Sequence, residues 1–158
     1  HNITLIIMEN GTTAMTGHQP RPGSGEVGEE IPLERLLTAL GVQFIREVDT
    51  YQQAQLTDHI EEAMACEGFA VVIARHPCML KFTRERRAKR PGFKTSQIEV
   101  NQEACDQSRV CIQTFGCPSF VSSPDGTVSV HEDLCIGDGS CMPTCPAHAL
   151  VRGKGGEK

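Results

Sequence analysis

A chain of 158 residues has room for one ordinary domain, or for part of a domain joined to a small second one. Its net charge of -5 argues against a general nucleic-acid-binding role, and six Phe, one Tyr and no Trp leave a core built mainly from aliphatic side chains. No segment resembles a signal peptide or is apolar enough to span a membrane, so we expect a cytoplasmic protein with neither nucleic-acid nor membrane partners.

The first eighty residues alternate between strand and helix patterns. A continuous apolar run from Ile3 to Met8 predicts a buried strand, and a loop rich in Gly, Thr, Pro and Ser follows it up to Glu30. The remaining predicted elements are a helix at 32–40, a strand at 42–48, a helix at 56–66 and a strand at 69–74. This order predicts an α/β layer with a parallel sheet, whose ligands bind beside the loop at the carboxyl end of the first strand.

Basic residues concentrate after the predicted α/β layer. The stretch has no helical apolar stripe and carries Pro91-Gly92 near its end, so we predict a basic linker at 81–97. This linker is either a solvated connector or a surface that lies across an acidic subunit or electron carrier. Seven of the 15 Lys and Arg residues lie in it, namely Lys81, Arg84, Arg86, Arg87, Lys89, Arg90 and Lys94.

The last third of the chain holds six of the eight cysteines in two runs. Their spacing is Cys105-x5-Cys111-x5-Cys117-Pro118 and then Cys135-x5-Cys141-x3-Cys145-Pro146. A short strand is expected before each run, at 98–100 and at 127–130, with a Pro-Asp-Gly turn between them.

Two cysteine runs that each close on Cys-Pro resemble the bacterial ferredoxins with two iron–sulfur clusters, in which the last thiolate of each run binds the other run's cluster. The resemblance places Cys105, Cys111 and Cys145 on one cluster, and Cys117, Cys135 and Cys141 on the second. The middle cysteine of the usual run is replaced by Ser108 in the first run and by Asp138 in the second. The replacement predicts three-iron (3Fe-4S) clusters or four-iron (4Fe-4S) clusters with an oxygen ligand, and an empty site is a further alternative because oxygen donors hold such clusters less firmly.

Other roles for the thiols fit the sequence less well. Zinc sites usually take ligands from two close pairs, and no C-x2-C pair is present. Disulfides need an oxidising compartment. The two remaining cysteines are predicted to be small buried hydrophobic residues, and single histidines without a partner at ligand spacing are predicted to have no catalytic role. These residues are Cys66, Cys78, His59, His76 and His131.

The loop after the first strand reads Met8-Glu9-Asn10-Gly11-Thr12-Thr13-Ala14-Met15-Thr16-Gly17-His18-Gln19-Pro20. It resembles the second half of the thiamine-diphosphate motif of the 2-oxoacid:ferredoxin oxidoreductase family, above all in the C-terminal part of the large (alpha) subunits that act on indolepyruvate. The likeness continues through Ile73-Ala74-Arg75-His76-Pro77-Cys78 and through the ferredoxin-like end. It implies a C-terminal part of a thiamine diphosphate (pyrophosphate-binding) domain at 1–80, the basic linker at 81–97 and a small α+β ferredoxin-like iron–sulfur module at 98–152.

The resemblance also implies a site. The side-chain oxygen of Asn10 and the carbonyl of Thr12 would bind the Mg²⁺ that joins the cofactor's diphosphate to the protein. The residues implied to contact the cofactor are Asn10, Gly11, Thr12, Thr16 and Gly17, and those implied to lie nearest to the substrate are Met15, Thr16 and His18. The family's third magnesium ligand, an upstream Asp, has no counterpart before this loop, so we expect the chain to be the C-terminal piece of a longer large subunit. The rest of that subunit and a second (beta- or gamma-type) subunit would complete the site.

The implied function is oxidative decarboxylation of a 2-oxoacid, such as indolepyruvate or another aryl pyruvate, to its acyl-CoA. Coenzyme A is then a co-substrate, and the electrons pass through the clusters to ferredoxin or a similar acceptor. Two alternatives remain open from the sequence. One is a non-oxidative thiamine-dependent decarboxylase with a degenerate tail, and the other is a non-catalytic electron-transfer or assembly module.

Overall fold

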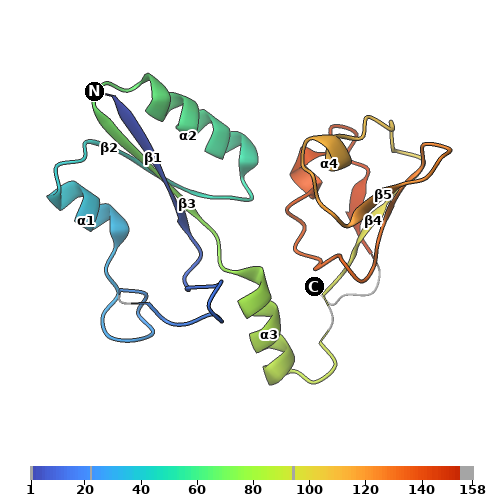
Figure 1. Cartoon of the computed structure of the whole chain (residues 1–158), viewed down its shortest axis with the longest axis horizontal. Helices are drawn as coiled ribbons and strands as arrows, with labels where there is room; N and C mark the ends of the chain where they lie inside the picture. Colours follow the sequence, from blue (N-terminus) through green and yellow to red (C-terminus); the bar gives the residue numbers. More distant parts are fainter. Residues whose placement is uncertain (1, 22, 94, 154–158) are drawn as a thin grey trace. The chain divides into compact units, whose positions relative to one another are not determined.

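The structure is a computed structural model that describes residues 2–21, 23–93 and 95–153. The chain divides into two compact units, His1–Phe82 and Thr83–Lys158, each with its own hydrophobic core (Figure 1). Within the described ranges, no helix is long and apolar enough to cross a membrane.

A three-stranded parallel sheet forms the centre of the first unit. Its strands are β1 (Ile3–Glu9), β2 (Phe44–Asp49) and β3 (Phe69–Arg75), in the order β1-β3-β2. The central strand is buried on both faces, and Val71, Val72 and Ile73 are each 0% exposed. Burial on both faces explains why the sequence of β3 is a continuous apolar run. The predicted parallel α/β layer is confirmed.

Two helices, α1 (Leu33–Ala39) and α2 (Gln53–Ala65), pack against opposite faces of this sheet (Figure 1). The core on the α1 side contains Leu37, Val42, Val71 and Ile73. The core on the α2 side contains Val48, Ala63, Ala70 and Val72. Successive side chains of β3 point to opposite faces, so one apolar strand supplies both cores. The helices cover the faces of the sheet, so the carboxyl ends of its strands are occupied by the loops that follow them.

The segment after β3 differs from its prediction. It is helical at α3 (Met79–Lys89), where the missing apolar stripe had indicated only a linker. No residue of α3 is buried, so the stripe that reveals most helices is not needed here. The helix forms because Leu, Arg, Lys, Glu and Ala have high helix propensity, and it ends shortly before Pro91-Gly92.

The second unit is built from two short antiparallel ribbons. β4 (Ile98–Val100) pairs with β7 (Leu150–Arg152), and β5 (Phe120–Ser122) pairs with β6 (Val128–Val130). Two single-turn helices, α4 (Val110–Gln113) and the 3-10 helix η1 (Met142–Thr144), lie within the cysteine runs. Strands β4 and β6 were predicted, whereas β5 and β7 were not. The core contains Ile98, Phe120, Val128, Cys141 and Leu150, and four further run cysteines, Cys111, Cys117, Cys135 and Cys145, pack against it.

Candidate functional site

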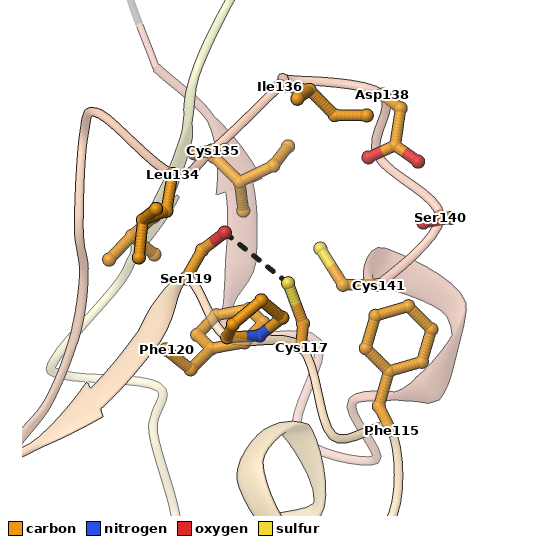
Figure 2. Close-up of a pocket in the computed structure, with 13 residues that line it drawn as sticks. Phe115, Cys117, Ser119, Phe120, Leu134, Cys135, Ile136, Asp138, Ser140 and Cys141 are labelled. Atoms are coloured by element: carbon orange, nitrogen blue, oxygen red, sulfur yellow. Dashed lines mark hydrogen bonds between the residues drawn. The ribbon is translucent and has the colours of Figure 1, made fainter. Parts of the chain in front are cut away.

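Two cavities in the second unit are lined by the six cysteines of the two runs. The larger, of about 360 Å³, is lined by Cys117, Cys135 and Cys141 together with Asp138 (the Asp138 site, Figure 2). The smaller, of about 20 Å³, is lined by Cys105, Cys111 and Cys145 together with Ser108 (the Ser108 site). Each group combines two thiols of one run with the last thiol of the other. This is the grouping that the resemblance to two-cluster ferredoxins implied.

The backbone wraps both sites in the same way. In the first run Gln107 and Arg109 have φ of 56° and 57°, and in the second run Gly137 and Gly139 have φ of 70° and 83°. The residue between each left-handed pair is the one that replaces the usual middle cysteine. A left-handed conformation is free for glycine but costs other residues about 1–2 kcal/mol each. The first run therefore adopts this turn without glycine, the residue type that adopts it at no cost. Backbone strain of this kind is typical of a functional loop.

The two replaced positions differ in where their side chains bond. The Ser108 amide donates to the Asp106 carboxylate at 3.0 Å, and this bond together with the Ser108 hydroxyl holds the pKa of Asp106 below its usual range. Both residues line their cavities, and Figure 2 shows the Asp138 carboxylate and the Sγ atoms of Cys117 and Cys141 directed into the same space. The Asp138 site therefore offers a fourth donor, while the hydroxyl at the Ser108 site is bonded to its own loop.

One thiol in each site lies in an environment that disfavours its charged form. Burial, followed by the negative charge of Asp138, raises the pKa of Cys141 to about 11. Burial and the neighbouring Cys105 and Cys145 likewise raise the pKa of Cys111 above its usual range. Neighbouring thiolates repel one another unless a positive charge lies among them. A bound metal ion supplies this charge, and a thiol that coordinates it is deprotonated. Sets of soft sulfur donors around one cavity fit an iron–sulfur cluster.

Two hydrogen bonds join cysteine sulfur atoms to other residues that line the cavities. The Cys117 thiol lies 3.4 Å from the hydroxyl of Ser119, which is only 4% exposed (Figure 2). The backbone amide of Ala149 donates to the Sγ of Cys145 at 3.4 Å. Hydrogen bonds to ligand sulfur tune the reduction potential of a cluster. Sequence analysis missed both contacts, because a serine or an alanine after Cys-Pro carries no signal of its own.

No group of three or more His, Cys, Asp or Glu side chains in the described part of the chain is arranged to hold a single metal ion. All eight cysteines are free thiols. The two outside the runs lie in the first unit: Cys66 packs against the α2-side core, and the amide of Cys78 donates to the carbonyl of Asn10 at 3.2 Å.

The loop after β1 is fixed by a dense set of hydrogen bonds. The side-chain oxygen of Asn10 accepts the amide of Thr12 at 3.0 Å, and the Thr12 hydroxyl donates to the carbonyl of Gln19 at 3.2 Å. Thr13 and Gln19 form an antiparallel bridge that closes the loop. An amide oxygen has two lone pairs, so the Asn10 side chain can accept this bond and still bind a cation. The loop thus holds oxygen donors at the carboxyl edge of the sheet.

An ion pair between a buried glutamate and a half-buried arginine supports this loop. Glu9, the last residue of β1, pairs with Arg21 and accepts the amide of Gly11 at 2.6 Å. Burial by itself raises the pKa of Glu9, but the bonds from Arg21 and Gly11 and the charges of Arg21 and Arg75 outweigh it, so the pKa lies below its usual range. Sequence analysis did not single out Glu9 or Arg21, because their pairing depends on how the loop folds back.

The remaining residues of the predicted cofactor loop are spread along its outer part. Met15 is 99% exposed, and the hydroxyl of Thr16 bonds the side chain of Gln19 at 2.9 Å. Gly17 has φ of 103° and His18 has φ of 62°, so the backbone turns sharply at both. Met15 and Thr16 are thus exposed on the loop that carries Asn10, whereas His18 is half-buried.

His76 has a partner that the sequence did not reveal. Its Nδ1 lies 3.0 Å from the Asp49 carboxylate, and its ring stacks on Tyr51 with a centroid distance of 3.7 Å. The Tyr51 amide, followed by His76, holds the pKa of Asp49 below its usual range. The group lies at the ends of β2 and β3, where the chain segments 49–51 and 75–76 meet.

Comparison with sequence families gives two matches. Residues 1–74 match the family described as thiamine pyrophosphate enzyme, C-terminal TPP binding domain, and residues 128–151 match the 4Fe-4S binding domain. No solved structure matches the chain. The fold and the site therefore define a thiamine pyrophosphate-binding domain that is joined to an iron–sulfur domain.

Curated proteins extend the likeness over almost the whole chain. Indolepyruvate oxidoreductase subunit IorA of Archaeoglobus fulgidus is 35% identical over 97% of this chain, and that of Pyrococcus horikoshii is 34% identical over 99%. The subunit of the same name in Methanothermobacter marburgensis is 36% identical over 92% of this chain. Over almost its whole length the chain is therefore similar to part of these IorA subunits. It spans about a quarter of their length, with 25%, 24% and 23% of the three relatives covered.

Proposed function

We propose that this chain is the part of a thiamine-dependent 2-oxoacid oxidoreductase that conducts electrons away from the cofactor. The complete enzyme oxidatively decarboxylates indolepyruvate or another aryl pyruvate to its acyl-CoA and passes the electrons to ferredoxin. The observation that carries the proposal is the grouping of six cysteines around two cavities, in a chain whose other unit matches a thiamine pyrophosphate-binding domain. Decarboxylation without oxidation would give such thiols no role.

The two sites would hold different clusters. The Ser108 site presents three thiols and a hydroxyl that is bonded to its own loop, which suits a three-iron cluster. The Asp138 site presents three thiols and a carboxylate that faces the cavity, which suits a four-iron cluster with one oxygen-bound iron. Ser119 and the Ala149 amide would then bias the reduction potentials through their bonds to Cys117 and Cys145.

The loop after β1 would hold the diphosphate end of the cofactor. The side-chain oxygen of Asn10 and the Thr12 carbonyl would bind Mg²⁺, which prefers oxygen ligands. Gly11, Thr16 and Gly17 would lie against the cofactor, and Met15 and His18 would face the substrate. When bound, thiamine diphosphate supplies the electron sink that lets a 2-oxoacid lose CO2. The Glu9–Arg21 pair keeps the loop in one conformation, so its donors are in place before the cofactor arrives.

The remainder of the large subunit and a second subunit would complete the site, and coenzyme A would accept the acyl group. The test therefore uses the complete enzyme, prepared without oxygen. Ferredoxin reduction that depends on an aryl pyruvate and coenzyme A is measured for the wild type, for Cys135→Ser in the Asp138 site and for Cys66→Ser as a matched control outside both sites.

The expected result is that Cys135→Ser loses most ferredoxin reduction and that Cys66→Ser keeps it. Aldehyde release without acceptor reduction in the wild type would identify a non-oxidative decarboxylase. Wild-type protein that contains no iron would leave an assembly role for the second unit. Either of these two results overturns the proposal.

A further inference from the structure

One guanidinium group holds the backbone on both sides of Asp138. Arg152, at the end of β7, donates from Nη1 to the carbonyl of Gly137 at 3.0 Å and from Nη2 to the carbonyl of Asp138 at 3.2 Å. These carbonyls belong to the two peptide groups on either side of the Asp138 Cα atom. Because the guanidinium is a rigid planar fork, two simultaneous bonds fix direction as well as distance.

The loop is also packed too closely to take another path. A Cβ atom on Gly137 would lie 2.3 Å from the backbone oxygen of Ser96, and one on Gly139 would lie 2.6 Å from Nη2 of Arg152. The Asp138 loop therefore passes between the Ser96 backbone and the Arg152 guanidinium. A side chain at position 137 would have to displace the Ser96 backbone, and one at position 139 would have to displace the Arg152 guanidinium.

Arg152 is itself fixed by strand pairing. It lies opposite Ile98 in the β4–β7 ribbon, and the next amide, that of Gly153, donates to the Gln97 carbonyl at 2.8 Å. The position of the backbone at Asp138 therefore follows from the register of a ribbon in the core of the second unit. Strand β5 follows the first cysteine run as β7 follows the second, and it ends at Ser122 in place of an arginine. The Ser122 hydroxyl donates to the adjacent Ser123 carbonyl at 3.5 Å, so the Ser108 loop has a different arrangement.

We propose that Arg152 is a positioning residue: it clamps the 137–139 loop so that the Asp138 carboxylate faces the cluster cavity and retains the fourth iron. The proposal rests on the proposed function, in which a cluster occupies the Asp138 site. An aspartate on an unclamped glycine-flanked loop would sample many directions, and its oxygen would bind the corner iron less often. Loss of such a supporting residue around a metal site typically weakens metal binding by about 10- to 100-fold.

The experiment measures the affinity of the corner iron in the complete, anaerobically prepared enzyme. Fe²⁺ is titrated into the reduced three-iron form, and Mössbauer spectroscopy follows its conversion to the four-iron form. This step adds one Fe²⁺ to a reduced three-iron core and needs no electron from elsewhere. Arg152→Met removes both the planar guanidinium fork and its charge, and Arg152→Lys keeps the charge alone. Arg87→Met removes an exposed charge from α3 and serves as the control.

Both Arg152 variants should need about tenfold more Fe²⁺ than the wild type for half conversion, and Arg87→Met should match the wild type. Circular dichroism checks that each variant is folded, and Arg152→Lys keeps the test decisive if Arg152→Met does not fold. Wild-type affinity in a folded Arg152→Lys protein overturns the clamp, because a lysine ammonium lacks the rigid planar fork on which the proposal depends. Asp138→Ala separates the two proposals. If it loses the corner iron while the Arg152 variants keep it, only the clamp is wrong, whereas a wild type without any cluster refutes the proposed function.

Discussion

Gly137 is the position where the Asp138 loop tolerates change least. At its φ of 70° an alanine costs about 1–2 kcal/mol. The added Cβ would also lie 2.3 Å from the Ser96 backbone oxygen, and overpacking of this kind costs about 1–3 kcal/mol more. We therefore expect Gly137→Ala to lower the free energy of unfolding of the second unit by about 2–5 kcal/mol.

Gly116 provides the matched control. Its φ of 68° is nearly the same, but a Cβ there meets nothing within 4 Å. Gly116→Ala should therefore cost only about 1–2 kcal/mol. The assay is denaturant unfolding of the complete protein followed by circular dichroism, with cluster absorbance recorded on the same samples. Equal destabilisation by the two substitutions would refute the reasoning, because it would mean that the contact with Ser96 does not confine the loop.

Two further predictions concern the surroundings of the proposed cofactors. Ser119→Ala removes the hydroxyl 3.4 Å from the Cys117 sulfur, so the potential of the cluster at the Asp138 site should become more negative; an unchanged midpoint in a redox titration contradicts this. Glu9, whose pKa lies below 4.5, stabilises the fold above that pH and loses this contribution as the pH falls through its lowered pKa. Arg21→Met brings the pKa of Glu9 closer to 4.5 or above it, so the variant should be less stable at neutral pH and lose less stability on acidification. Thermal unfolding between neutral and acidic pH tests this, and a loss as large as that of the wild type would count against it.

The sequence predicted the elements that carry a long or repeated signal. The apolar run of β3 predicted a strand buried on both faces, and the family resemblance of the two cysteine runs implied the grouping of Cys117 with Cys135 and Cys141. The strand depends on residues that are close together in the chain. The grouping depends on a cysteine spacing that few other structures share. The assignment of these thiols to clusters, and of Asn10 and its neighbours to thiamine diphosphate, remains a proposal.

What the sequence did not predict depends on tertiary contacts. Strands β5 and β7 were not predicted, and they are strands because β6 and β4 pair with them. Helix α3 buries no residue and so has no stripe to detect. Ser119 and Arg152 gain their positions only after the ribbons form, and a lone serine or arginine in a sequence gives no hint of such a contact.

Diffraction from crystals of the complete, anaerobically prepared protein, with anomalous scattering measured at the iron absorption edge, tests the central claim most directly. The account predicts two separate groups of iron atoms. One would lie among Cys105, Cys111 and Cys145, and the other among Cys117, Cys135 and Cys141 with the Asp138 carboxylate on one iron. A single metal ion among these thiols, disulfides between them, or no iron at either place would contradict it.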